Sequence, residues 1–133
     1  MIQGMVSFVP GRRGVRVTAE ITGLPENGSG FFALHIHEGR SCSGQGFPET
    51  GGHFNPGRQS HPLHAGDLPP LLNCHGSAYL FVETDRFIIP EIIGKTVVIH
   101  SEADDFRSQP AGNAGEKIAC GVIRKMQKQM SLY

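Results

Sequence analysis

The chain is built from short apolar runs separated by turn-forming residues, a pattern that few folds other than an all-β fold can use. The runs are rich in branched and alternating apolar residues, and helical periodicity is almost absent. The intervening segments draw on 18 glycines and 9 prolines. We therefore predict an all-β Greek-key β-sandwich or flattened barrel. Strands are expected over residues 5–9, 15–21, 31–37, 78–83, 87–89, 96–100 and 118–124.

Two longer segments, residues 38–74 and 101–116, interrupt this rhythm and are rich in Gly, Pro, Asn and Asp. A compact domain rarely keeps an irregular loop of roughly 35 residues unless something organises it. The first segment contains His53, His61, His64 and Asp67, so a metal is the expected organiser. We read both segments as long functional loops.

Length and charge narrow the alternatives further. The 133 residues suit a single domain over 1–133, with residues 124–133 expected as a frayed tail. Lys+Arg and Asp+Glu balance at 12 each, so the net charge favours neither nucleic acid nor an anionic membrane as a partner. No apolar stretch reaches the ~20 residues of a membrane helix. The first residues lack the features of a signal peptide, which indicates a cytoplasmic protein, or an exported one whose leader has been removed.

The first candidate ligands are His35 and His37, separated by Ile36. Residues two apart in a strand point to the same face, so both imidazoles would project together. By itself an HxH pair is weak evidence for a metal, because such histidines are often structural.

The second cluster lies in GGHFNPGRQSHPLHAGD and supplies His53, His61, His64 and Asp67. Three imidazoles and a carboxylate suit tetrahedral zinc, whereas solvated loop histidines are the alternative. His100 ends the apolar run TVVIH and, with His35, His37 and His53, would complete the four-nitrogen set that Cu(II) prefers. Two such sites need eight ligands and only seven candidates are present without His75, so one imidazole must serve both metals.

Five ordered motifs, HIHEG, GGHFNP, HAGDLP, GKTVVIHSEADD and GNAGEKIACGVI, resemble the signature segments of the Cu/Zn superoxide dismutase family. The resemblance runs from about Gly4 to Arg124. It implies a dismutase that converts superoxide to dioxygen and hydrogen peroxide, with copper and zinc as cofactors. The implied copper ligands are His35, His37, His53 and His100; the implied zinc ligands are His53, His61, His64 and Asp67, with His53 as the bridge and proton carrier.

The same resemblance assigns roles to further residues. Asp104 resembles the carboxylate that links a copper histidine to a zinc histidine, here His35 and His61, although neighbouring Asp105 could take that role. Cys42 and Cys120 resemble the family's disulfide pair. The residues alone leave two alternatives open: three free thiols, or one disulfide and one free thiol. Cys74 is expected to be a free thiol, buried or nearly so.

Two departures from the family pattern affect the functional reading. Lys117 stands where the family usually has an arginine that draws in the superoxide anion; lysine keeps the charge but lacks the planar guanidinium. The strand that normally precedes IQGMVSF is not found before Met1, so strand edges near 5–9 and 118–124 could pair with each other or form a homodimer. The alternative function is a related metal-binding protein, stabilised by zinc and binding or storing copper, with little dismutase activity.

Overall fold

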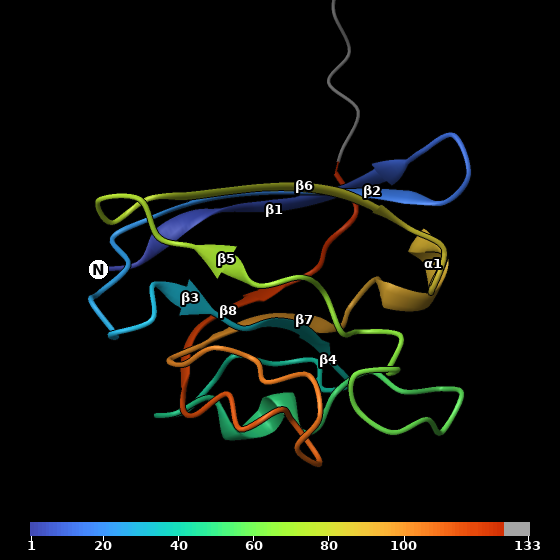
Figure 1. The fold of residues 1–133 in the computed structure, drawn as a ribbon. Coiled ribbons are helices and arrows are strands. Elements are labelled where there is room, and N and C mark those ends of the chain that lie inside the picture. The colour runs from blue at the N-terminus through green and yellow to red at the C-terminus, as the bar shows by residue number, and fades with distance from the viewer. Residues whose placement is uncertain (127–133) are drawn as a thin grey trace, which may run out of the picture.

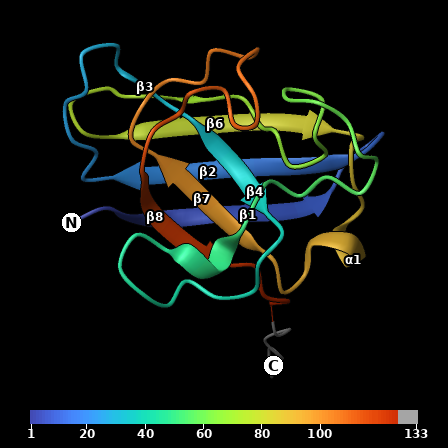
Figure 2. The same ribbon diagram turned by 90° about the horizontal axis from the view of Figure 1, so that it is seen from below.

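The computed structural model describes residues 1–126 as two packed layers of antiparallel strands (Figure 1). One layer has the order β1-β2-β6 and the other β4-β7-β8, and the strands of the two layers cross obliquely (Figure 2). A third, two-stranded pair, β3-β5, lies at one side. The strands are β1 (Gln3–Pro10), β2 (Val15–Thr22), β3 (Phe31–Phe32), β4 (Leu34–His37), β5 (Leu71–Leu72), β6 (Ala78–Thr84), β7 (Thr96–His100) and β8 (Lys117–Val122); the helical turns are η1 (Pro48–Thr50) and α1 (Ile89–Ile92). The predicted β-sandwich is confirmed, but its sheets do not close into a barrel within residues 1–126.

The core lies between the two layers and follows the period-two pattern of the strands. In β2, buried residues alternate with exposed ones from Val15 to Ile21. In the opposite layer Leu34, Ile36 and Ile99 belong to the same buried apolar cluster. Alternate residues of β4 and β7 must therefore point to the other face of that layer, away from the core. This face carries the histidines.

Residues 31–37 form two strands rather than the single predicted one. The break falls at Ala33, whose N–H donates to the carbonyl of Glu102 and whose carbonyl accepts the N–H of His100. On either side of it, β3 pairs with β5 and β4 pairs with β7. The short strand β5 escaped prediction because two leucines in a Pro-rich loop carry no periodic signal.

The strand predicted over residues 87–89 is wrong, because helix α1 begins at Ile89. Pro90 suits the first turn of a helix, where its missing N–H costs no hydrogen bond. The Glu91 side chain accepts the N–H of Ile88 at 2.9 Å and so caps the same turn. Phe87 and Ile92 are buried, which explains why a three-residue apolar run looked like a strand.

The turn between β1 and β2 is fastened by a side chain from β6. The carboxylate of Glu83 accepts the backbone N–H of Arg12 at 3.2 Å and that of Arg13 at 3.0 Å. The hydrogen bond from Arg13 is the largest influence on Glu83 and lowers the pKa of that exposed carboxyl.

Both long loops lie against the outer face of the β4-β7-β8 layer (Figure 1). A disulfide joins Cys42 in the first loop to Cys120 on β8, as the family resemblance implied. Cys74 is a free thiol as expected, but it is exposed rather than buried. No helix among the described residues is long and apolar enough to cross a membrane. Most of the expected frayed tail, residues 127–133, lies outside the described residues.

Candidate metal centre

Three of the predicted ligands stand on the outer face of one sheet. His35 and His37 project from β4, and His100 ends the adjacent strand β7. Their neighbours Leu34, Ile36 and Ile99 fill the core on the opposite face, so the strand period alone fixes which way the imidazoles point. The loops cover them, leaving His35 0%, His37 2% and His100 3% exposed.

The first long loop completes the site by pairing with the free edge of β4. His53 forms a backbone bridge opposite His37, and Asp67 forms one opposite His35. The segment between them is drawn in so closely that a Cβ on Gly66 would overlap the carbonyl oxygen of Ile36. Ladder hydrogen bonds thus place two loop ligands beside two strand ligands.

His35, His37, His53 and His100 form one group whose potential ligand atoms lie within 4.8 Å of one another. The Nδ1–H of His37 donates to the Gly51 carbonyl at 2.8 Å, and Nδ1 of His100 lies 3.4 Å from the Gly115 carbonyl. The remaining Nε2 atoms of His37 and His100 face each other at 3.1 Å. With both protons used elsewhere, two lone pairs converge, an arrangement that a shared cation would stabilise.

Two more ring nitrogens belong to this group. Nδ1 of His35 and Nε2 of His53 are buried without a hydrogen bond among the described residues. A buried polar atom left unpaired is rare and costly, so it points to a missing ligand. Burial lowers the pKa of His37 to about 3 and that of His100 to about 4, which keeps both imidazoles neutral and able to bind a metal.

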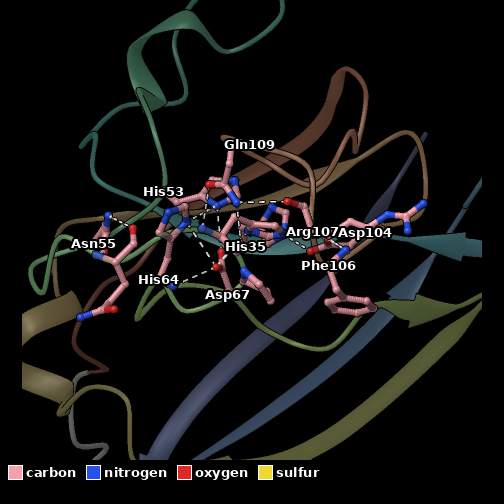
Figure 3. A network of polar contacts seen from close by, with 12 residues as sticks. His35, His53, Asn55, His64, Asp67, Asp104, Phe106, Arg107 and Gln109 are labelled. Carbon is pink, nitrogen blue, oxygen red and sulfur yellow. Dashed lines mark hydrogen bonds and ion pairs between the residues drawn. The ribbon is translucent and has the colours of Figure 1, made fainter.

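A second group lies on the loop side of His53. The carboxylate of Asp67 is 2.8 Å from Nδ1 of His53, 3.0 Å from Nδ1 of His61 and 3.2 Å from Nδ1 of His64. Despite that distance, Nδ1 of His61 makes no hydrogen bond among the described residues, because its direction is wrong for one. The crowding of nitrogens and a carboxylate suits a zinc ion (Figure 3).

Asp104 links the two groups from behind. Its carboxylate accepts Nε2–H of His35 at 2.8 Å, Nε2–H of His61 at 2.7 Å and the N–H of Phe106 at 2.8 Å (Figure 3). Burial opposes ionisation, but these hydrogen bonds outweigh it and lower the pKa of Asp104 to about 2. Both imidazoles are thereby held with Nε2 protonated and Nδ1 free.

Asp105 was the other candidate for the carboxylate that links His35 and His61, but its contacts are different. It is exposed and accepts the backbone N–H groups of Arg107 and Ser108, which shapes the loop. Gly112 packs behind the Asp104 link with φ +71°; a Cβ there would lie 2.6 Å from Nε2 of His61 and closer still to the Asp104 carboxylate.

Lys117, at the start of β8, lies beside the first group. Its Nζ donates to Oγ1 of Thr50 at 2.7 Å and to the Gly51 carbonyl at 3.1 Å. Its charge helps to lower the pKa values of His37 and His100, after the larger effects of burial and neighbouring histidines. The carbonyl of Gly51 therefore accepts hydrogen bonds from both Lys117 and His37.

Several supporting contacts could not be predicted from the sequence. Gln109 clamps His61 by accepting its N–H at 2.9 Å and donating to its carbonyl at 2.7 Å. Arg86 donates to the carbonyls of Pro62 and His64. These contacts join segments far apart in the chain, so no local sequence pattern marks them.

Comparison with known proteins identifies the scaffold. Residues 2–123 match the family described as copper/zinc superoxide dismutase (SODC). The chain belongs to the Cu/Zn superoxide dismutase family. It is 34% identical to the Cu-Zn superoxide dismutase of Deinococcus radiodurans, covering 92% of this chain and 78% of that protein. It is 35% identical to Cu-Zn superoxide dismutase 2 of Aquifex aeolicus, covering 91% and 78%.

Solved structures of this family show the same fold. A SOD-like protein from Bacillus subtilis superposes with a TM-score of 0.78 at 28% identity, covering 90% of this chain and 89% of that one. The Cu/Zn superoxide dismutase from Brucella abortus gives 0.76 at 28% identity, covering 91% and 88%. Copper and zinc are the family's metals. Two groups of the described residues could hold a metal ion, one of His35, His37, His53 and His100 and the other of His35, His53, His61 and Asp67.

Proposed function

We propose that this chain is a superoxide dismutase, and that His35, His37, His53 and His100 hold its copper while His53, His61, His64 and Asp67 hold its zinc. The observation that carries the proposal is that the two ring nitrogens of His53 face different groups of ligands. Its Nδ1 lies beside Asp67 and His64, whereas its Nε2 is buried next to the His35 ring and makes no hydrogen bond within residues 1–126. One imidazole therefore faces both groups, as the ligand count required.

The overall reaction combines two superoxide anions and two protons to give dioxygen and hydrogen peroxide. Copper, when bound, supplies one-electron redox chemistry that takes an electron from one anion and gives one to the next. The protein's residues supply position, charge and protons.

His53 is the proposed proton carrier. Its Nε2 has no hydrogen-bond partner among the described residues, so whenever this nitrogen is not ligating a metal it could take a proton and release it at the reacting oxygen. Asp67 holds Nδ1 on the far side of the ring, which keeps the imidazole from turning. Asp104 fixes the tautomers of His35 and His61.

Lys117 is the proposed source of attraction for the substrate anion. Its ammonium group is half-buried and tethered to Thr50 and Gly51, so the charge is held in place rather than swinging in solvent. Replacing it by Gln should slow the reaction roughly 10-fold at low ionic strength. The loss should shrink as salt is added; a loss that ignored salt would assign Lys117 a structural role instead.

The defining experiment is pulse radiolysis of the copper- and zinc-loaded protein. His100→Ala should lose both stoichiometric copper and activity, whereas His75→Ala, an exposed histidine outside both groups, should retain them. If the loaded protein bound both metals and showed no dismutation, the alternative of a copper-binding or storage protein would replace the enzyme. Lys117 in place of the family's arginine is the observation that favours that alternative.

The homodimer expected from the strand edges also stays a prediction. Within residues 1–126, β1 pairs only with β2 and β8 only with β7, so one edge of each could pair with a second copy. Sedimentation equilibrium of the full chain would show whether it forms.

A further inference from the structure

The outer face of the β1-β2-β6 sheet presents large apolar side chains to solvent. Residues of these strands that point inward fill the core, so alternation turns Met5 and Val9 of β1 and Tyr79 and Phe81 of β6 outward. They are 65%, 48%, 66% and 56% exposed, respectively. The second layer and both long loops lie on the other side of this sheet (Figure 1). Because the solvent face of an antiparallel sheet is usually polar, apolar residues gathered there indicate a surface that meets a partner.

The central strand β2 carries charges on the same face. Arg16 and Glu20 are exposed and stand two residues to either side of Thr18. Among the described residues Arg16 makes a polar contact only with the Glu83 carboxylate, through Nε at 3.4 Å. The face therefore has a charged stripe along β2 between apolar side chains on β1 and β6.

The strand register sorts these side chains into three rows that run across the sheet. Each row takes one outward residue from β1, β2 and β6 in turn. The rows are Val9, Arg16 and Glu83; Ser7, Thr18 and Phe81; and Met5, Glu20 and Tyr79. The middle row is uncharged, and the two outer rows carry opposite charges on β2.

This pattern is complementary to itself. If a second copy is turned by 180° about the middle row and laid on the face, the first row of each copy lies over the third row of the other. Arg16 then faces Glu20 of the second copy, and Val9 faces Met5. Phe81 meets the Phe81 of the second copy at the axis. Every off-axis contact occurs twice, as in an isologous dimer.

The remaining members of the outer rows match as well. Tyr79 lies over Glu83 of the second copy, whose carboxylate can accept its phenolic O–H. Stacked sheets are turned by about 30° through their twist. The outer rows lie only about 7 Å from the axis, two residues along a strand, so long side chains stay within reach of their partners.

The charges exclude the other way of stacking two such faces. A twofold axis along β2 would place Arg16 on Arg16 and Glu20 on Glu20. Like charges directly opposite each other are destabilising. The sequence of β2 therefore selects the axis that runs across the strands.

We propose that two copies of this chain associate through the outer faces of their β1-β2-β6 sheets, with the twofold axis along the row of Thr18. The candidate metal centres then point away from each other, because each lies on the far layer of its sandwich. Three strands about 4.8 Å apart and about seven residues long bury on the order of 1,000 Å² over both copies, the lower limit of a specific interface. The dimer is accordingly weak and forms at about 100 µM and above.

Sedimentation equilibrium of the full chain between about 10 µM and 1 mM, at low salt, tests the proposal. Glu20→Arg should raise the dissociation constant about 10-fold, since it replaces two attractive contacts per dimer by two repulsive ones. Adding Arg16→Glu to that variant restores opposite charges and should recover most of the association. Phe81→Glu sets two carboxylates against each other at the axis and should abolish the dimer. Glu102→Arg and Leu72→Glu, exposed and outside this face, should associate as the unaltered chain does.

Three results would overturn the proposal. The first is a chain that stays monomeric up to 1 mM. The second is a dimer that neither Glu20→Arg nor Phe81→Glu weakens, which would assign it to another surface such as the free edges of β1 and β8. The third is a double charge variant that associates no better than Glu20→Arg alone, which would rule out this axis. No readout is activity, so the outcome is independent of whether the chain is a dismutase.

Discussion

Replacing Asp104 by Ala should weaken metal binding at both proposed sites, but by different amounts, although both depend on this one carboxylate. The side chain accepts hydrogen bonds from His35 and His61, so both imidazoles lose the partner that fixes their tautomer. The consequences should differ, because the two histidines are held in different ways. His35 lies in β4 and is paired through its backbone on both sides, whereas His61 lies in a loop clamped by Gln109.

The magnitude follows from the hydrogen bond that the His61 ring donates to the Asp104 carboxylate. A hydrogen bond to a charged group contributes about 1.5–3 kcal/mol, which corresponds to roughly 10- to 150-fold in affinity. We expect zinc to bind weaker by about that factor, in line with the ~10–100-fold typical when an outer partner of a metal ligand is removed. Copper should weaken less, because β4 still aims His35.

Competition against a chelator of known affinity, with each metal added alone, measures both constants. Asp105→Ala is the matched control, since Asp105 is the neighbouring carboxylate and touches neither imidazole. Unchanged zinc affinity in the Asp104 variant, or an equal loss in the Asp105 variant, would refute the reasoning. A loss confined to copper would show that the strand does not hold His35 in place.

Further predictions concern the loops and the β1-β2 turn. Cys42→Ser opens a disulfide that spans 78 residues and should lower the free energy of unfolding by about 4.5 kcal/mol in urea titration, whereas Cys74→Ser should leave it unchanged. Gly112→Ala should weaken zinc binding about as much as loss of the carboxylate behind it, while Gly28→Ala, also at positive φ but with open space around it, should bind normally. Glu83→Gln should lower Tm at pH 7, and because the folded carboxyl has a depressed pKa, the difference from the unaltered protein should narrow as pH falls below 4.5, which calorimetry would show.

Sequence reasoning succeeded where a period or a residue type carries the information. The HxH pair in a strand predicted two imidazoles on one face, and the structure places His35 and His37 there. The choice between Asp104 and Asp105 could not be made from neighbours in sequence, because it depends on which one a loop turns inward. The resemblance favoured Asp104, whose carboxylate contacts His35 and His61; that it supports the metal ligands stays a prediction.

Sequence reasoning failed where the pairing of strands is set by contacts between segments far apart in the chain. Nothing periodic marks the segments around His53 and Asp67 as partners for the edge of β4, since each contributes only an isolated bridge. Likewise, the apolar run at 87–89 fits a strand or a helix equally until Pro90 and Glu91 are seen to cap a turn. Such short elements are decided by what they pack against.

The candidate metal centre brings together buried ring nitrogens, which is unfavourable by itself. Its position on the outer face of the sheet explains how the fold tolerates them. Nitrogens of His37 and His100 meet at 3.1 Å, and three other buried ring nitrogens have no partner among the described residues. A sandwich can hold such groups because its apolar core lies on the opposite face of β4 and β7, where Ile36 and Ile99 stabilise the strands independently of any metal. The cost of desolvating the imidazoles is therefore offset by core packing before a cation arrives.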